Sequence, residues 1–282
     1  MNCAFNQENS AVVVCVAPNG AKKTYNDHPA IPLTPDEMAS ESVACVNAGA
    51  SVLHLHVRDD QLEHSLDINR YHAAIKAIKA QTKNALLIQV TTESVGRYNA
   101  FQQSNLIKHL KPAAASIALK ELAPKDSDIT NLNELCEFSR AHEIGLQFIV
   151  YSAQEAERLV SMTQNGDLAC DKPNTLFVLG RYHKHQQSNP RQLLPFLANW
   201  PENWPWSVCA FGHQETLCMT AGVALGGHVR VGFENNLFRP DGTRADNNAD
   251  LVRNIVDLVQ HTNRKVATVE QAMTVYGATR LT

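Results

Sequence analysis

Short apolar runs recur along the chain, and between them apolar residues repeat at the spacing of one helix face. The runs are rich in valine, leucine and isoleucine. Such runs are typical of parallel strands, which are buried on both faces because helices cover them. The pattern predicts eight strands, at residues 12–17, 52–57, 86–91, 114–119, 146–151, 175–180, 206–211 and 228–233.

Helix signals fill the gaps between these runs. Thr34 to Glu37 combine a capping box with a proline at the first helical position, so a helix is expected from here to Gly49, where glycine tolerates the left-handed conformation. Asp67 begins the next helix, and a capping box at Thr268 begins the last, which should end at Gly277. The remaining helices are expected near residues 99–110, 130–143, 153–164, 191–198, 214–225 and 248–261.

Eight strand–helix units without repeats or low-complexity linkers predict an α/β fold, a single (β/α)8 TIM barrel formed by one domain of residues 1–282. An open, doubly wound sheet is the alternative. Neither G-x-G-x-x-G nor G-x-x-x-x-G-K-[ST] follows a predicted strand, so the usual nucleotide-binding signatures are missing from the sequence.

Composition narrows the classes of function. The chain is 44% hydrophobic and 19% charged, as globular proteins are, and its net charge of −3 argues against a broad basic face for nucleic acid. No apolar run approaches the roughly 20 residues of a membrane helix, and the polar start of the chain does not resemble a signal peptide. Seven cysteines without a C-x-x-C pair indicate reduced thiols in a cytoplasmic protein.

The clearest chemical signal is His54-Leu55-His56 at the end of the second predicted strand. In a TIM barrel the chemistry lies at the C-terminal ends of the strands, and residues two apart on a strand share a face. The pair could be metal ligands or two hydrogen-bonded core histidines. Glu234 ends the eighth strand, which closes the barrel beside the first two. Two histidines and a carboxylate leave coordination positions open, as in catalytic zinc sites and in non-haem iron sites.

Other polar residues end the predicted strands. The hydroxyls of Thr91, Thr92 and Ser116 could hold a substrate carboxylate, although threonine is also an ordinary strand residue. Lys120 could form a Schiff base, or could be an ordinary ion-paired lysine. His183 and His185, a second H-x-H, fall in a polar loop and are expected at the surface. Further strand ends place Lys22, Glu93, Tyr151, Arg181, His213 and Arg230 at the mouth, whereas His28, His64, His72, His109, His142 and His261 are expected to be structural.

Several segments together resemble the β-keto acid cleavage enzymes. The most specific are HLHVRD and GGHVRVGFE, and the resemblance spans essentially the whole chain in order. The matching segments are Ala17 to Ala21, AGASVLHLHVRDD at 48–60, 177–180, GGHVRVGFENN at 226–236, 247–252 and 267–272.

This resemblance implies a zinc-dependent (β/α)8 barrel, typically a homotetramer. The family condenses a β-keto acid with acetyl-CoA to give acetoacetate and a new acyl-CoA. By resemblance, His54, His56 and Glu234 would bind Zn²⁺, and Thr91 and Ser116 would hold the substrate carboxylate. Arg230 falls on the arginine that partners the family's catalytic aspartate.

The sequence departs from the family at the position of that aspartate, which is Asn235 here. An amide cannot accept a substrate proton as a carboxylate does. The base has therefore moved, with Glu93 as the nearest candidate carboxylate, or the barrel binds metal without this activity.

Two more departures concern the substrate. The family's P-E-x-E in the fifth strand becomes residues 146–149, Leu-Gln-Phe-Ile. Lys22 and Lys120 replace acidic or neutral residues, which predicts a substrate with an additional anionic group.

Overall fold

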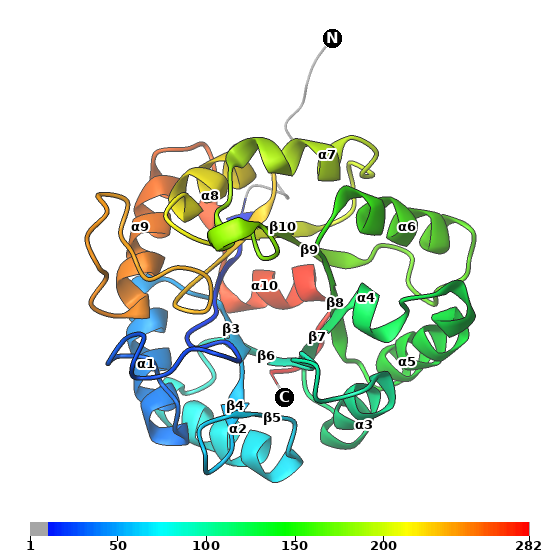
Figure 1. The fold of residues 1–282 in the computed structure, drawn as a ribbon, viewed down its shortest axis with the longest axis horizontal. Coiled ribbons are helices and arrows are strands. Elements are labelled where there is room, and N and C mark those ends of the chain that lie inside the picture. Colours follow the sequence, from blue (N-terminus) through cyan, green and yellow to red (C-terminus); the bar gives the residue numbers. More distant parts are fainter. Residues whose placement is uncertain (1–10, 282) are drawn as a thin grey trace.

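The computed structural model describes residues 11–281. Eight parallel strands close into a barrel in the order β10, β11, β2, β3, β6, β7, β8, β9 (Figure 1), which confirms the predicted (β/α)8 fold. The strands are β2 (Val14–Val16), β3 (Val52–Leu55), β6 (Leu87–Thr91), β7 (Ala114–Ala118), β8 (Gly145–Val150), β9 (Asn174–Leu179), β10 (Trp206–Ala210) and β11 (His228–Val231).

Helices surround the barrel, and their ends follow the local signals. Thr34 makes both bonds of its capping box, and the first helix ends at Gly49 with φ of 106°. Asp67 and Thr268 cap their helices as expected, and Gly277 ends the last one in the left-handed conformation. The helices are α1 (Pro35–Ala48), α2 (Ile68–Thr82), α3 (Ala100–Leu110), α4 (Leu119–Leu122), α5 (Ile129–Ala141), α6 (Ala153–Gln164), α7 (Leu194–Leu197), α8 (Glu215–Ala224), α9 (Asn248–Gln260) and α10 (Val269–Tyr276).

Three predicted elements differ in detail. The strand expected at 12–17 is split: β1 (Ala11–Val12) pairs with β12 (Lys265–Val266) outside the barrel, and β2 alone joins it. The strand expected at 52–57 ends at Leu55, because β4 (Val57–Arg58) turns away to pair with β5 (His64–Ser65).

The helix expected at 191–198 is the third difference. It is a 3₁₀ turn, Pro190–Leu193, followed by the four residues of α7. Pro190 and Pro195 each lack a backbone N–H, which limits a continuous helix here. Two further 3₁₀ turns, Asp126–Asp128 and Lys184–Gln186, lie in loops.

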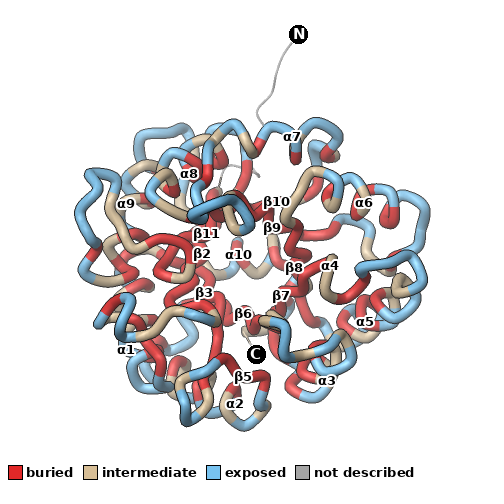
Figure 2. The backbone as a smooth tube through the Cα atoms, in the orientation of Figure 1, coloured by how far each residue is buried: buried red, intermediate tan, exposed pale blue. Residues whose placement is uncertain are grey.

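Burial follows the barrel architecture (Figure 2): the strands are buried, and the exposed positions lie on the outer helix faces and loops. The main core lies between strands and helices. At the N-terminal end of the strands, Tyr276 of α10 packs in a small cluster with Val13, Cys15 and Leu87, so this helix covers that end. The opposite, C-terminal end is left for the loops that carry the predicted chemistry.

Within residues 11–281 no helix combines the length and apolar character needed to cross a bilayer. The six cysteines of this range are free thiols, and Cys3 lies outside the described residues, as does the polar start of the chain.

Helix α8 approaches β10 closely at Gly222. A Cβ there would lie 2.5 Å from Cγ1 of Val208. We expect Gly222→Ala to lower the free energy of unfolding, measured by denaturant titration, by about 1–3 kcal/mol through overpacking. In a Val208→Ala background the same change should be neutral or stabilise by up to about 1 kcal/mol, since alanine favours helix over glycine. Equal destabilisation in both backgrounds would contradict this packing.

Candidate active site

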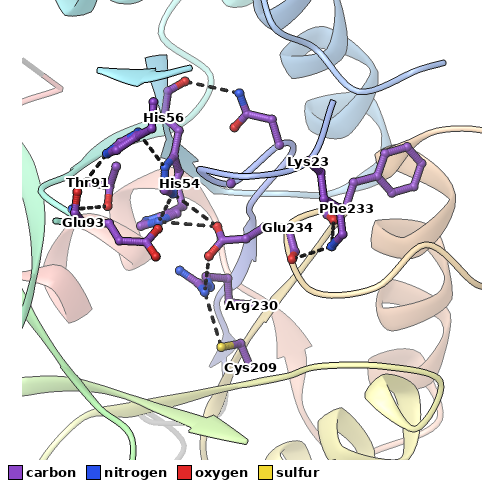
Figure 3. A network of polar contacts seen from close by, with 12 residues as sticks. Lys23, His54, His56, Thr91, Glu93, Cys209, Arg230, Phe233 and Glu234 are labelled. Atoms are coloured by element: carbon purple, nitrogen blue, oxygen red, sulfur yellow. Dashed lines mark hydrogen bonds and ion pairs between the residues drawn. The ribbon is translucent and has the colours of Figure 1, made fainter. Parts of the chain in front are cut away.

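Three electron-pair donors converge at the C-terminal end of the barrel (Figure 3). The Nε2 atoms of His54 and His56 lie 3.1 Å apart, and Oε2 of Glu234 lies 3.6 Å and 3.4 Å from them. This trio is a candidate metal cluster. A point equidistant from three atoms at these spacings lies about 2.0 Å from each, the length of zinc bonds to nitrogen and oxygen. The triangle therefore fits a divalent cation.

The strand register fixes the ring of His54. His54 and Gln89 are paired across β3 and β6, and His54 Nδ1 lies 2.8 Å from Gln89 Oε1. An amide oxygen only accepts, so Nδ1 carries the hydrogen and Nε2 presents its lone pair. Gln89 is itself held by Gln147 Oε1, which accepts from its amide at 3.0 Å. The structure thus aims a neutral imidazole at the cluster.

A second chain of contacts orients His56. His64 Nε2 donates to the carbonyl oxygen of Glu93 at 2.9 Å, which leaves its Nδ1 as an acceptor. His56 Nδ1 lies 3.4 Å from that acceptor and donates to it, so His56 Nε2 also presents a lone pair. Outer contacts of this kind are typical of metal-binding histidines. His64, expected to be merely structural, thus supports a candidate ligand.

The charges of the trio suit a cation. Burial, helped by the positive charge of Arg230, lowers the pKa of His54 to about 4. Burial also lowers the pKa of His56 well below its usual value, so both rings are neutral at pH 7. Burial alone would raise the pKa of Glu234, but the positive charge of Arg230 holds it well below the ordinary value. The cluster carries one negative charge, and Oε2 of Glu234 is buried without a hydrogen-bond donor.

Contacts with Arg230, Gly20 and Lys23 hold Glu234 in place. Arg230 donates to its Oε1 at 3.0 Å. A Cβ on Gly20, which has φ of 61°, would lie 2.5 Å from Cγ of Glu234, so only glycine leaves room there. Lys23 Nζ donates to the carbonyl oxygens of Phe233 and Glu234 at 2.6 Å and 2.7 Å. No motif in the sequence marks Lys23.

A small cavity adjoins the trio. Thr91 and Ser116 line it from the neighbouring strands β6 and β7, and their role in substrate binding stays a prediction. Ser116 Oγ is buried without a hydrogen-bond partner. Thr91 Oγ1 accepts from the Glu93 backbone at 3.2 Å and keeps its hydrogen free to donate. The cavity is lined by His54, Thr91, Glu93, Ser116, Ala118, Ile149, Tyr151, Val178, Arg181, Phe211, Arg230 and Glu234.

Glu93 faces this cavity and pairs with Arg181, whose guanidinium lies 3.3 Å from its carboxylate. Burial and the negative charge of Glu234 raise the pKa of Glu93 to about 7, against the opposing effect of Arg181. Arg181, expected at the mouth as a strand-end residue, lies two residues after β9 and lines the cavity. The pair supplies a carboxyl group that changes protonation near neutral pH.

Other predicted residues lie elsewhere. Thr92 Oγ1 donates to the Ser116 carbonyl at 3.1 Å and does not line the cavity. Lys120 Nζ lies 3.6 Å and 4.1 Å from the ring centres of Tyr182 and Tyr151, outside the lining, which does not favour a Schiff-base role. Lys22 is exposed and lines an adjoining hollow.

Asn235 and the second H-x-H, His183 and His185, also lie apart from the trio. The Asn235 side chain is buried with no hydrogen-bond partner at either polar atom, and it does not line the cavity. His183 and His185 are exposed, as expected of a surface pair.

Comparisons with known proteins agree with these features. A family model of beta-keto acid cleavage enzymes matches residues 11–277. A 3-keto-5-aminohexanoate cleavage enzyme of Fusobacterium nucleatum is 26% identical over 265 residues, 93% of this chain and 96% of that protein. A 3-oxoadipate:acetyl-CoA acetyltransferase of Cupriavidus necator is 27% identical over 273 residues, 94% of each chain.

Solved structures support the fold. The apo structure of ObcA superposes with a TM-score of 0.70 at 16% identity, over 89% of this chain and 66% of that one. Since the family model spans nearly all of the described residues, the chain belongs to the family of beta-keto acid cleavage enzymes.

Proposed function

We propose that this protein cleaves a β-keto acid with acetyl-CoA as co-substrate. In the net reaction the C2–C3 bond of R–CO–CH₂–COO⁻ breaks and C2 bonds to the acetyl carbon, giving acetoacetate. The R–CO group leaves as the new acyl-CoA. The observation that carries the proposal is the convergence of His54, His56 and Glu234 beside a cavity lined by two hydroxyl groups, in a member of this family.

We assign a divalent cation, Zn²⁺, to the trio. Two neutral imidazoles and one carboxylate are a donor set of catalytic zinc sites. The support is the spacing of the three donor atoms and the unpartnered Oε2 of Glu234. A cation bound there would polarise the 3-keto oxygen and stabilise negative charge on it.

The substrate carboxylate has partners next to the trio. Ser116 Oγ and Thr91 Oγ1 face the cavity with hydrogens to donate, and Arg230 lies beside them. Together they would orient the β-keto acid with its C2 hydrogens toward Glu93. Holding both reacting groups in place removes much of the entropic barrier.

Glu93 is the proposed base in place of the family's aspartate. Its carboxylate lies in the cavity and would accept a proton from C2, whereas the amide of Asn235 cannot. Arg181 is a positioning residue, since its guanidinium holds the Glu93 carboxylate at 3.3 Å. Arg230 plays the same part for Glu234. The cytoplasmic location and the homotetramer stay predictions from the sequence.

Metal binding should depend on the trio. His54→Ala and Glu234→Gln should each weaken zinc affinity, measured by competition with a chromogenic chelator, by more than about 100-fold. Gln89→Leu removes the acceptor that orients His54, and it should weaken zinc affinity by about 10–100-fold.

His185→Ala is the matched control, since it removes one histidine of the exposed H-x-H and should keep one full equivalent of zinc. Full zinc affinity in both His54→Ala and Glu234→Gln would remove the trio as the site.

Loss of the base should appear in the pH profile. Glu93 must be deprotonated to accept the C2 proton, so activity should rise with pH through its pKa. That pKa is raised to about 7 in the protein without metal, and a bound cation would draw it lower. Glu93→Gln should lower kcat by about 10²–10⁴-fold and abolish this rise.

Glu63→Gln, at an exposed carboxylate paired with Arg97, serves as the control and should retain the native profile. An unchanged profile in Glu93→Gln would assign the base elsewhere.

A further inference from the structure

The inner faces of four strands carry an apolar cluster that is separate from the main core. All its members are buried, and the side chain of Tyr151 packs against it. Residues two apart on a strand share a face, and these side chains face the interior of the barrel. The cluster comprises Ala118 of β7, Ile149 of β8, Leu176 and Val178 of β9, Cys209 of β10, and Phe211 just after β10.

The apolar cluster occupies one half of the barrel mouth, and the polar site occupies the other. Strands β7, β8, β9 and β10 are consecutive in the barrel, so their apolar residues form one continuous wall. The trio and its supports come from the opposite side, from β3, β6 and β11 and the loops after them. Ala118, Ile149, Val178 and Phe211 line the same cavity as His54 and Glu234.

The charged groups that face the cavity form ion pairs with one another. Arg230 pairs with Glu234 at 3.0 Å and Arg181 pairs with Glu93 at 3.3 Å. Arg181 also lies 5.0 Å from the ring centre of Phe211. A charged group placed against Ile149 and Val178 would lose its hydration to apolar side chains, which is costly.

We infer that the R group of the β-keto acid is a short, uncharged hydrocarbon that lies on the wall formed by β7 to β10. This inference rests on the proposed function, since the reacting carboxylate and keto group occupy the polar half. It replaces the expectation of an additional anionic group, which relied on Lys22 and Lys120. The ammonium of Lys120 lies on two tyrosine rings, and Lys22 is exposed at the rim.

Three six-carbon 3-oxo acids that differ in the charge of the R group test this. They are 3-oxohexanoate (uncharged), 3-oxoadipate (anionic) and 3-keto-5-aminohexanoate (cationic). With the zinc-loaded protein and acetyl-CoA, kcat/KM for acyl-CoA formation should favour 3-oxohexanoate over both charged acids by at least about 100-fold. Calorimetric titration of the same acids without acetyl-CoA should give the same ranking of affinity.

A charge placed in the wall should alter the ranking. Ile149→Glu should lower kcat/KM for 3-oxohexanoate by about 100-fold and raise it for 3-keto-5-aminohexanoate, whose ammonium gains a partner. Ile149→Gln is the matched control: it should lose 3-oxohexanoate activity without gaining the amine-bearing acid. Thermal melting of each variant reports whether it is folded, and the wild-type panel decides the inference if a variant is not.

The possible failures are distinguishable. Preference of the wild-type protein for either charged acid, in turnover or in binding, overturns the inference and leaves the proposed function standing. If no acid gives acyl-CoA, the proposed function fails, and the calorimetric ranking alone decides the inference. Absence of binding by all three acids overturns both.

Discussion

The site depends on two imidazoles that stay neutral while they face a carboxylate. A protonated histidine beside Glu234 would form an ordinary buried ion pair, and no cation would be needed. Burial instead lowers the pKa of both His54 and His56. Gln89 and His64 then fix which ring nitrogen carries the hydrogen, so both lone pairs and Oε2 of Glu234 point at one position. Such an arrangement leaves mutually repelling lone pairs, which a cation relieves.

The barrel supplies this arrangement through its register. Pairing of His54 with Gln89 puts the orienting amide on the neighbouring strand, and closure of β11 on β2 brings Glu234 to the histidines. The same closure leaves β7 to β10 on the far side, where apolar residues face inward. One end of the barrel can therefore hold a polar reacting group and a hydrocarbon chain side by side.

Local sequence signals predicted most of the fold. Caps at Thr34, Asp67 and Thr268 act within a few residues of themselves, so the sequence alone predicts where their helices begin. The trio was also predictable, because a strand has a period of two and the eighth strand of a barrel meets the first. The split of the first strand was not, since it depends on β12 more than 200 residues away.

Long-range contacts explain what the sequence did not reveal. His64 returns to His56 only because β4 and β5 form a hairpin, and no motif marks it. Lys120 was expected at a strand end, where a candidate nucleophile would lie. It falls in α4 instead, and its ammonium lies against rings from the loops after β8 and β9. Thr92 follows Thr91 directly, so the period of two turns its hydroxyl away from the cavity.

We propose that one cation joins His54, His56 and Glu234. Anomalous diffraction at the zinc absorption edge, from crystals grown with one equivalent of Zn²⁺, would locate that cation. We expect a single strong peak about 2.0–2.2 Å from both Nε2 atoms and from a Glu234 oxygen. A peak elsewhere, for instance at the exposed His183 and His185, with none between these three side chains would contradict it.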